Sequence, residues 1–404
     1  MSISRTTRRV LLSTILPGAG GVPVKKSLAV AWLRERGYEP VIAYYAPHSL
    51  HPEPSVPSWK LLQRMPGSVR TEDVDGCETH AMGAWLPELE FTHYRLTAAW
   101  KALIDSCAYH IGICGSVHAL TPFHASNLPY LGWVATGWEE DVRSRRADFS
   151  TARRLLERSV VIPGMMALER KILSRGTILA VSEHTRRVLD NIAGRRATHA
   201  VLPIPIDLDY FRPAAGQDDP ALVGFTGRLR DPRKNLPLLL QAIALLKAAG
   251  SPASLLLAGD ELDARTAAMI EMLGIGDRTR VLPFVPKDEL AGLLRSVAVY
   301  VLPSHQEGLC IAALEAMASG APVISTRCGG PADYVVDGET GYLVDFDPRM
   351  MADRIQRTLS DPTHRTRLSA GARGFVEQHY RHDLARSIFW DAFDRCFGPS
   401  GKAA

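Results

Sequence analysis

Short apolar segments, many of them rich in β-branched residues, alternate along the sequence with longer segments of helical periodicity. In the first half of the chain the apolar segments are 10–16, 40–45, 111–116, 130–136 and 177–182. Helical patterns, such as that of residues 24–36, lie between them. Strands that alternate with helices in this way form parallel sheets. We therefore predict an α/β domain over residues 1–205.

The alternation stops in the proline-rich stretch VLPIPIDLDYFRP (201–213) and then restarts. The apolar segments of the second series are 221–227, 254–260, 280–285, 298–303 and 322–326. They predict a second α/β domain over residues 210–379. The amphipathic end of the sequence, within residues 380–404, predicts a helix that packs on the first domain. Residues 48–74 are rich in Pro and Ser and predict a loop.

The composition narrows the class of protein. The 404 residues are 46% hydrophobic and 22% charged, which is typical of a folded, water-soluble protein. A formal charge of +4 is small for this length and does not indicate binding to nucleic acid. The six cysteines form no CxxC pair and have no His at zinc-ligand spacing, so the sequence predicts no metal site and a reducing, cytoplasmic location. The apolar run VLLSTIL is shorter than the core of a usual signal peptide and predicts the first strand.

Two acidic residues stand out in the stretch SHQEGLCIAALEAMASGAP (304–322). Glu315 is the only charge between Gly308 and Gly320, in a pattern that predicts a well-covered helix. An unpaired carboxylate there would cost several kcal/mol, so Glu315 needs a polar partner. Glu307 lies eight residues earlier, a helical distance of roughly 12 Å that matches an extended diphosphate ligand.

Backbone and side-chain groups nearby fit the phosphates of such a ligand. Gly308, Leu309 and Cys310 are predicted to begin the helix, where unpaired N–H groups bind anions. The basic loop GFTGRLRDPRKN (224–235) follows a strand, and cations at strand ends suit a departing diphosphate. Its candidate side chains are Arg228 and Lys234, whereas Arg230 and Arg233 fit solvated loop charges. Two glycine turns that also follow strands could supply further N–H groups: Gly20 with Gly21, and Gly329 with Gly330.

These patterns resemble a known enzyme family. The E-x7-E pair, the preceding GR-x5-K and the following GGPADYVVDGETGYLV are similar to motifs of the retaining nucleotide-sugar glycosyltransferases of family 4. The resemblance covers residues 221–379, and the first half resembles the family more loosely, through PGAGGVPVKKSLAVAWLRERGYEP and ILAVSEHTRRVL. It implies the GT-B fold, in which two Rossmann-like domains face each other across a cleft and the C-terminal helix returns to the N-terminal domain.

The resemblance also implies roles for the candidate residues. Glu315 would hydrogen-bond the ribose hydroxyls of the donor, and Glu307 would lie against its sugar and phosphates. Arg228 and Lys234 would bind the departing diphosphate without a bound metal or cofactor. The implied reaction is a hexosyl transfer from a UDP- or GDP-sugar to a small-molecule, glycan or lipid-linked acceptor. It would take place in the cytoplasm, with the inner face of the membrane as one candidate place.

The sequence departs from the family on the acceptor side. The family's Asn-Gly-Val-Asp motif at the domain crossing is PIPID here, so only Asp207 is kept. A histidine that many members place near the sugar is absent, and Trp138 or Glu139 takes its position, with His118 as a further candidate. Trp138 also fits a residue that closes the core. A group of arginines fits an anionic acceptor or lipid surface as well as a solvated helix face: Arg143, Arg145, Arg146, Arg153, Arg154 and Arg158.

Two other classes of function stay open. One is a sugar-nucleotide epimerase or phosphorylase with the same fold, and the other is a donor-binding accessory subunit of a glycosylation system. The four residues Arg228, Lys234, Glu307 and Glu315 favour an enzyme over the accessory subunit. The missing histidine keeps the accessory subunit open as an alternative.

Overall fold

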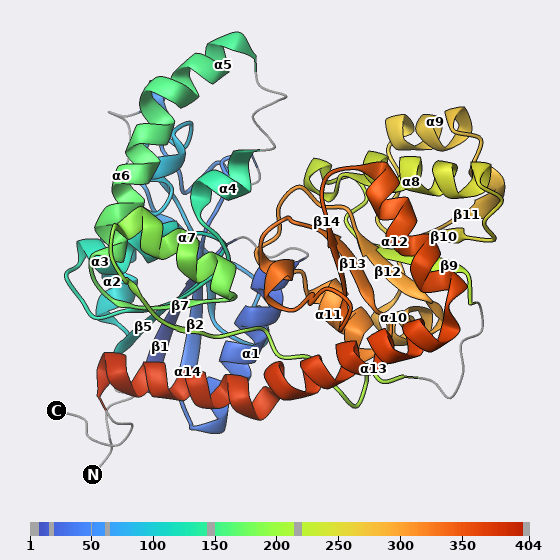
Figure 1. The fold of residues 1–404 in the computed structure, drawn as a ribbon. Coiled ribbons are helices and arrows are strands. Elements are labelled where there is room, and N and C mark those ends of the chain that lie inside the picture. The colour runs from blue at the N-terminus through green and yellow to red at the C-terminus, as the bar shows by residue number, and fades with distance from the viewer. Residues whose placement is uncertain are drawn as a thin grey trace. The chain divides into compact units, whose positions relative to one another are not determined.

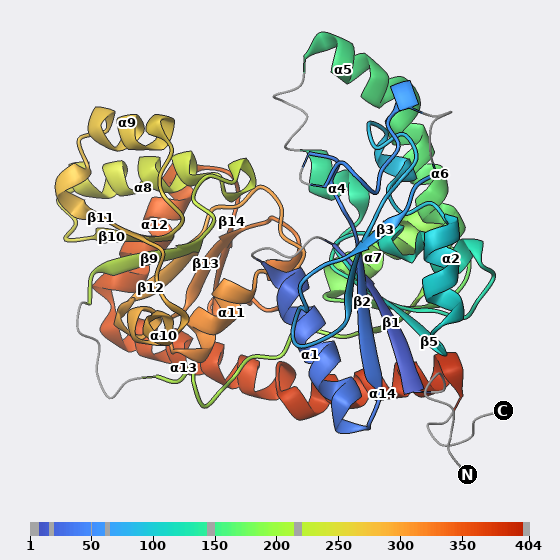
Figure 2. The ribbon, with the colours of Figure 1, turned by 180° about the vertical axis from the view of Figure 1, so that it is seen from behind.

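The computed structural model describes residues 8–15, 20–49, 51–60, 65–143, 150–213 and 220–398. The chain divides into two compact units. Unit 1 consists of residues 1–204 and 386–404, and unit 2 consists of residues 205–385. Each unit is a sheet covered by helices (Figures 1 and 2).

The described part of unit 1 is built on an eight-stranded sheet with the order β3-β4-β2-β1-β5-β6-β7-β8. The strands are β1 (Arg9–Thr14), β2 (Glu39–Tyr45), β3 (Ser68–Arg70), β4 (Thr79–Met82), β5 (Tyr109–Cys114), β6 (Leu131–Val134), β7 (Thr177–Ala180) and β8 (Thr198–Val201). The pairs are parallel, apart from the antiparallel pair of β3 with β4. All three residues of β3 are exposed, so this edge strand carries no apolar alternation. For that reason the prediction of an unbroken loop over residues 48–74 is wrong at β3.

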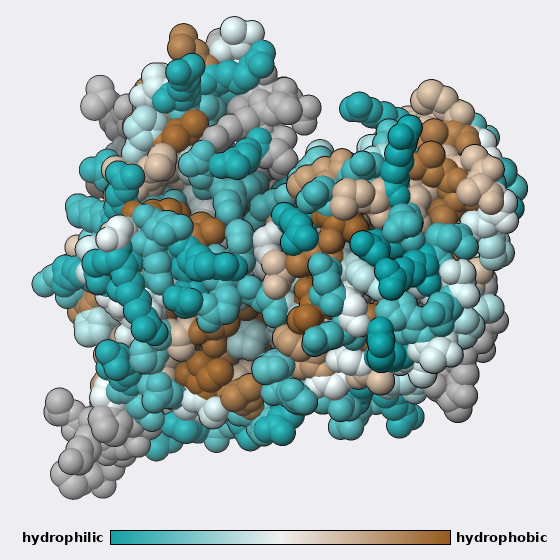
Figure 3. All heavy atoms as spheres, viewed as in Figure 1, coloured by the Kyte–Doolittle hydropathy of each residue, from teal (hydrophilic) through white to brown (hydrophobic). Residues whose placement is uncertain are grey.

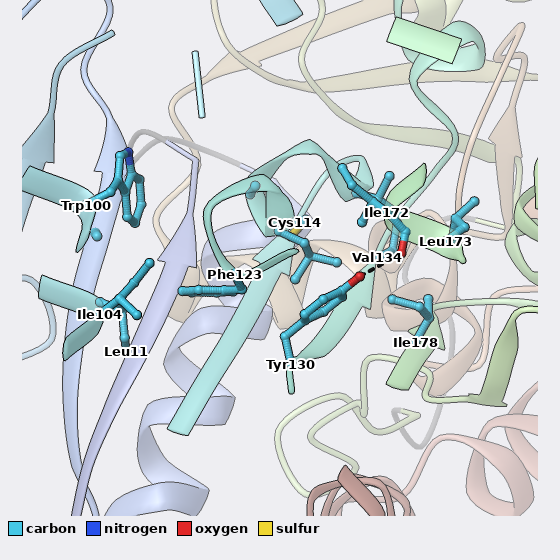
Figure 4. Close-up of a cluster of buried hydrophobic side chains, with 14 of the residues drawn as sticks. Leu11, Trp100, Ile104, Cys114, Phe123, Tyr130, Val134, Ile172, Leu173 and Ile178 are labelled. Carbon is cyan, nitrogen blue, oxygen red and sulfur yellow. Dashed lines mark hydrogen bonds between the residues drawn. The ribbon is translucent and has the colours of Figure 1, made fainter. Parts of the chain in front are cut away.

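The helices of unit 1 follow the strands in the predicted alternation. They are α1 (Gly21–Glu35), α2 (Ala98–Asp105), α3 (Thr121–Ala125), α4 (Trp138–Arg143), α5 (Thr151–Leu156), α6 (Ile162–Leu173) and α7 (Glu183–Ala193). A π-helical turn, Glu157–Val161, joins α5 to α6 without a break. Figure 4 shows part of the core between sheet and helices, where the Tyr130 hydroxyl donates to Ile172 O over 2.7 Å.

Unit 2 contains a six-stranded parallel sheet in the order β11-β10-β9-β12-β13-β14 among its described residues. The strands are β9 (Leu222–Gly227), β10 (Ser254–Gly259), β11 (Thr279–Pro283), β12 (Val299–Leu302), β13 (Val323–Thr326) and β14 (Gly341–Val344). The helices are α8 (Leu236–Ala248), α9 (Ala264–Met272), α10 (Lys287–Ser296), α11 (Ile311–Ala318), α12 (Pro348–Ser360) and α13 (Pro362–His379). α8 packs against α12, and α11 packs against α10 and α13 (Figure 1). Two α/β units with parallel sheets confirm the predicted fold class.

The last helix, α14 (His382–Phe397), belongs to unit 1 from Arg386 onward. Its aromatic side chains pack on α1 and on the start of β5. Phe389 lies 5.3 Å from Trp32 between ring centroids, and Phe393 lies 5.3 Å from Tyr109. The Arg36 guanidinium lies 3.7 Å from the ring centroid of Trp390. The amphipathic pattern at the end of the sequence therefore marks a helix that covers unit 1, as predicted.

Candidate active site

The loops after β9 and β12 meet in unit 2 through an ion pair. Lys234 Nζ lies 2.7 Å from Glu307 Oε1, and each side chain is only 13% exposed. The Ser304 hydroxyl donates to the same carboxylate oxygen over 2.7 Å. Both loops follow strands of a parallel sheet, the edge at which such sheets bind their ligands. The structure therefore brings together two of the residues that the sequence singles out, one from the β9–α8 loop and one from the β12–α11 loop.

The charge of Lys234 is secured by this pairing. Burial alone would lower the pKa of the Lys234 ammonium. Glu307, with a smaller contribution from Cys310, raises the pKa by more than burial lowers it, so the pKa lies above its ordinary value. Lys234 is therefore a cation at neutral pH. An anionic ligand would therefore meet the Lys234 ammonium beside Glu307, at the position that this ion pair fixes.

The β9–α8 loop is held in shape by Asp231. This carboxylate accepts the Arg233 N–H over 3.0 Å and pairs with the Arg228 guanidinium over 2.7 Å. Burial raises the pKa of Asp231, but the hydrogen bond and charge of Arg233 lower it more, so its pKa lies below the ordinary value. The Arg228 side chain is 50% exposed, so it is more accessible to a ligand than the Lys234 side chain, which is 13% exposed.

Two hydrogen bonds join the two loops. The His305 backbone N–H donates to Arg233 O over 2.7 Å, and the Asn235 side-chain amide Nδ2 donates to Pro303 O over 3.1 Å. Asn235 has a left-handed backbone with φ 50°, which turns the chain from the loop into α8. Ser304 and Asn235 thus shape the site, although the sequence reading passed over both. The signal for Ser304 was its position two residues after the end of β12 and three residues before Glu307.

The glycine turn after β13 is hydrogen-bonded to the Glu307 loop. Glu307 N–H donates to Cys328 O, and Gly330 N–H donates to Glu307 O, both over 2.8 Å. A Cβ on Gly330 would lie 2.2 Å from Gly308 O, so only glycine fits. The Gly330 N–H is thus used inside the protein and is not an open donor for phosphate. This corrects the role predicted for Gly330, while Gly329, with φ 112°, makes the turn possible.

Helix α11 begins later than predicted. Cys310 has a left-handed backbone with φ 66° and precedes the first helical residue, Ile311. Gly308 and Leu309 therefore belong to the loop, and Leu309 is 5% exposed with its carbonyl bonded to the Tyr334 hydroxyl. The first N–H groups of the helix belong to Ile311 and the two residues after it. A donor contact by the N–H groups of Gly308, Leu309 and Cys310 stays a prediction, without the helix start that motivated it.

Glu315 lies on α11, one turn beyond Ile311, and is half-buried. Its neighbours Leu314 and Ala316 are fully buried, as the apolar pattern predicts. The interval between Glu307 and Glu315 is helical only from Ile311 onward, so it is not the continuous helix assumed above. Ribose binding by Glu315 stays a prediction.

Trp138 in unit 1 is part of a core and is not an open wall. It is 2% exposed and packs with Val142, Val161 and Met165. Its indole N–H donates to Glu90 over 2.9 Å, and its backbone N–H donates to Glu169 over 3.0 Å. The acceptor-side role predicted for Trp138 therefore gives way to the alternative in which Trp138 closes the core. The sequence could not show this, because Glu90 and Glu169 are 48 and 31 residues away.

His118 and Glu139 differ in their surroundings. His118 is 7% exposed, and its ring nitrogens lie 2.9 Å from Ser116 Oγ and 3.4 Å from Met165 O. Burial lowers the pKa of His118 to about 4, so the ring is neutral near pH 7. The side chain of Glu139 is 39% exposed and lies 3.8 Å from Arg143. Of the three acceptor-side candidates, Glu139 alone presents a substantial polar surface.

The glycine turn of unit 1 leads into α1, with Gly20 at φ 118° and Gly21 as the first helical residue. One turn further lies Lys25, a buried lysine that the sequence reading did not single out. Its ammonium donates to Cys114 O over 2.7 Å and to Trp133 O over 2.8 Å, at the ends of β5 and β6. Burial lowers the pKa of Lys25 to about 7. Lys25 therefore bonds to the carboxyl ends of β5 and β6, the same end of the sheet at which the Gly20 turn follows β1.

Comparison with known proteins gives these features a context. Residues 209–375 match the family model described as "Glycosyl transferases group 1". The chain is 96% covered by a sucrose-phosphate synthase structure from Thermosynechococcus elongatus, with TM-score 0.71, 19% identity and 99% of that chain matched. The fold is GT-B. A second GT-B neighbour is Anabaena Alr3699/HepE, solved in complex with UDP and glucose, with TM-score 0.68, 15% identity and coverage of 96% and 100%.

Relatives found by sequence add a further likeness. The chain is 33% identical over 237 residues to a D-inositol 3-phosphate glycosyltransferase of Frankia alni, covering 52% of this chain and 57% of that protein. It is 28% identical over 331 residues to the Thermomonospora curvata protein of the same name, covering 71% and 74%. In the first three matches the chain spans only 57%, 51% and 50% of the relatives' length.

The matched segment contains every unit 2 candidate, from Arg228 to Gly330. In unit 2, the buried cation Lys234 and the exposed cation Arg228 lie at the same edge of the sheet. Glu307 pairs with Lys234, and Asp231 pairs with Arg228. The two cations can neutralise charge that grows on a departing diphosphate. Among the described residues, no group of three His, Cys, Asp or Glu side chains is arranged to hold a metal ion.

Proposed function

We propose that this chain is a retaining hexosyltransferase of family 4 that uses a UDP- or GDP-sugar and a hydroxyl acceptor. The observation that carries the proposal is the Lys234–Glu307 pair, which stands at two strand ends within the segment that matches the group 1 family. The complex of the HepE neighbour with UDP and glucose supports a nucleotide-sugar donor. The glycosyltransferase names of the relatives support the transfer.

The reaction breaks the bond between the anomeric carbon of the sugar and the β-phosphate oxygen. Arg228 and Lys234 neutralise the negative charge that moves to this oxygen, while Glu307 holds the Lys234 ammonium in place. The acceptor oxygen bonds to the anomeric carbon on the face that the diphosphate leaves, and its proton passes to the leaving diphosphate oxygen. In this proposal no protein nucleophile, metal or cofactor is needed, because the protein supplies alignment and positive charge.

A two-stage experiment tests the proposal. A thermal-shift screen of the full chain against UDP, GDP and their sugars identifies the base, because a ligand at a hundredfold its Kd adds about 2.7 kcal/mol of stability. NMR of the products of transfer to a panel of glycans and small polyols then gives the anomeric configuration. A product with the configuration of the donor supports retention, and an inverted product contradicts it. A chain that no nucleoside diphosphate stabilises would contradict the donor assignment itself.

Assays with the same sugar nucleotides distinguish the other two classes of function. An epimerase or a phosphorylase turns over a sugar nucleotide without an acceptor, in the second case when phosphate is added. An accessory subunit binds the donor and turns over nothing. The buried, charged Lys234 favours an enzyme, because pairing a cation inside a site has a cost that simple donor binding does not require.

The peripheral membrane contact belongs to this proposal, and helix α5 supports it. α5 extends beyond the sheet of unit 1 (Figures 1 and 2). It exposes Leu155 by 69% and Leu156 by 37%, and the π-helical turn after it exposes Val160 by 42%. Hydrophobic residues lie there among hydrophilic ones (Figure 3). Arg154 and Arg158 are exposed one turn apart on the neighbouring face and pair with no described carboxylate. An apolar strip beside arginines fits an anionic bilayer surface.

This contact would place the enzyme in the cytoplasm, at the inner leaflet, and favours a lipid-linked acceptor over a free glycan or small molecule. Glu157 and Val161 anchor the helix to the unit, because both side chains are buried and lie one turn apart. The exposed apolar strip therefore faces away from the protein. Within the described ranges, no helix is both long and apolar enough to cross a membrane.

A further inference from the structure

A concave site lies in unit 2, at the opposite end of the sheet from Glu307. It is a pocket of about 260 Å³ between the start of β14 and the helices α12 and α13. β13 and β14 are parallel and in register from Val323 with Gly341 to Thr326 with Val344. The Glu307 loop contacts the chain just after the end of β13, whereas the pocket is lined by Asp337 and Tyr342 around the start of β14. The pocket is therefore separate from the candidate active site.

Three arginines line the pocket: Arg354 and Arg357 from α12, and Arg367 from α13. Arg354 and Arg357 are three residues apart, so they share one face of their helix. The Arg354 guanidinium lies 4.9 Å from the ring centroid of Tyr342, and this stacking fixes its direction. Arg354 lies 3.8 Å from the exposed Asp353 carboxylate. Within the described ranges, Arg357 and Arg367 form no ion pair with a carboxylate, so their charges are not neutralised by the protein.

A hydrogen-bonded chain orients the other donors. The Arg367 guanidinium lies 3.0 Å from His364 Nδ1 and, having no acceptor, must donate to it. His364 Nδ1 is then unprotonated, and Nε2 carries the hydrogen that it donates to the Tyr342 hydroxyl oxygen over 2.6 Å. Tyr342 keeps its own hydroxyl hydrogen for another acceptor. His364 and Tyr342 are 8% and 6% exposed, so the chain is built into the protein and is not a surface accident.

We propose that this pocket binds the phosphate group of a small ligand. The lining offers three guanidinium groups and one phenolic hydroxyl as donors, and planar guanidinium groups match the geometry of phosphate oxygens. Asp337 is the one acidic side chain of the lining, and its Oδ1 already accepts the Leu343 N–H over 2.7 Å. The volume exceeds that of orthophosphate, so a phosphomonoester with a small organic group fits best.

Calorimetric titration of the full chain with inorganic phosphate at low ionic strength tests the proposal. Arg357→Gln should weaken phosphate binding by about tenfold or more, the loss expected for one charge-assisted hydrogen bond. Arg349→Gln is the matched control, because it removes the same charge from the same helix. Arg349 is exposed and does not line this pocket. Arg357 is exposed, so its variant should fold. Equal affinities of the two variants, or no phosphate binding by the parent chain, would overturn the proposal.

Two further arms separate this site from other sources of phosphate binding. Lys234→Met removes the cation of the candidate active site and should leave the phosphate affinity within twofold of the parent value. A loss confined to that variant would assign the phosphate to the active site and overturn the pocket. Vesicles with phosphatidic acid distinguish a lipid headgroup from a soluble phosphate. If Arg357→Gln abolishes vesicle binding, the pocket binds phosphate and the phosphate belongs to a lipid headgroup. If Arg357→Gln leaves vesicle binding unchanged, the phosphate ligand of the pocket is soluble.

Discussion

Lys234 and Glu307 are 73 residues apart in the sequence, yet their charged atoms lie 2.7 Å apart at the edge of one sheet. Neither side chain can be removed alone without leaving the other charge mostly buried and unpaired. Their pairing also explains why both loops must keep their shape. The hydrogen bonds of the His305 backbone N–H and the Asn235 side-chain amide tie the same loops together, so the pair is held by the fold and need not wait for a ligand.

Lys234→Ala should therefore lower kcat by about a hundredfold, the range for removing one preorganised group that stabilises charge in a transition state. The donor KM should change less, because the charge on the diphosphate grows as the bond breaks. Steady-state kinetics with the donor found in the thermal-shift screen measure both constants. Lys247→Ala is the control, because Lys247 is a partly exposed lysine on the adjacent helix, paired with Asp277 over 2.6 Å. A rise in KM alone would mean that Lys234 binds the ground state and does not act on the leaving group.

Glu315→Gln should weaken binding of the nucleoside diphosphate by about 1.5–3 kcal/mol, the range for hydrogen bonds to a charged group. The substitution keeps the size of the side chain, so α11 should stay folded. Isothermal titration calorimetry with the correct nucleoside diphosphate measures the loss. Comparison with the 2′-deoxy nucleotide isolates the ribose, since the variant and the deoxy ligand should lose overlapping contributions. An unchanged affinity in Glu315→Gln would remove the residue from the donor site.

Gly330→Ala should destabilise the protein by about 1–3 kcal/mol, because the new methyl group would lie 2.2 Å from Gly308 O and the backbone must shift. The shift would also move the Glu307 loop, so donor binding should weaken in the same variant. Chemical denaturation and calorimetry measure the two effects. Gly374→Ala is the matched control, because Gly374 lies within α13 and a Cβ there would meet no atom within 4 Å. Equal stability of the two variants would show that the loop adjusts without cost.

The sequence predicted the two α/β units and named both partners of the central ion pair. These features depend on local patterns: strand and helix periodicity, and charged residues directly after strands. It misplaced the start of α11, because the left-handed backbone of Cys310 has no signature in a run of small and apolar residues. It also misread Gly330, since the bond from its N–H to Glu307 O joins segments that are distant along the chain.

The acceptor side shows the same limit more strongly. Trp138 follows a strand and precedes an acidic run, a pattern that suits both a binding wall and a core residue. The choice between them depends on Glu90 and Glu169, which accept its two N–H groups. Burial raises the pKa of Glu169 to about 7, and the charges of Glu139 and Glu140 contribute in the same direction. No local pattern marks a carboxylate that is recruited to a buried N–H.

Lys25 gives a prediction for the pH dependence of stability. Burial lowers its pKa from 10.5 to about 7 in the folded protein. Between these two values the unfolded chain holds a proton that the folded protein has released, so unfolding becomes less favourable as the pH rises. Lys25 should therefore make the free energy of unfolding increase from about pH 7 toward pH 10, with a slope of at most about 1.4 kcal/mol per pH unit.

Urea denaturation across that pH range measures the slope. The slope attributed to Lys25 should disappear in Lys25→Met, and it should persist in Lys101→Met, since Lys101 is an exposed lysine paired with Asp105 on one helix. The loss of the bonds to Cys114 O and Trp133 O lowers the stability of Lys25→Met at every pH. The comparison therefore uses the slopes and not the absolute values. Identical slopes in the parent chain and Lys25→Met would show that the lysine stays charged in the folded protein.

The exposed apolar strip on α5 and the π-helical turn after it gives the last prediction. Changing Leu155, Leu156 and Val160 to Ser removes most of the apolar surface that would enter a bilayer, and about 0.8 kcal/mol is lost for each CH₂ group no longer buried. Sedimentation with vesicles that contain an anionic lipid should therefore show strong binding by the parent chain and little by the variant. Because these side chains are exposed, the unfolding midpoint should change little, and transfer to a soluble acceptor should stay near the parent rate. A second variant, Arg154→Gln with Arg158→Gln, should bind anionic vesicles less tightly and lose most of its dependence on salt. Vesicle binding that neither variant reduces would place the membrane contact elsewhere on the chain, and an absence of binding by the parent chain would refute the contact.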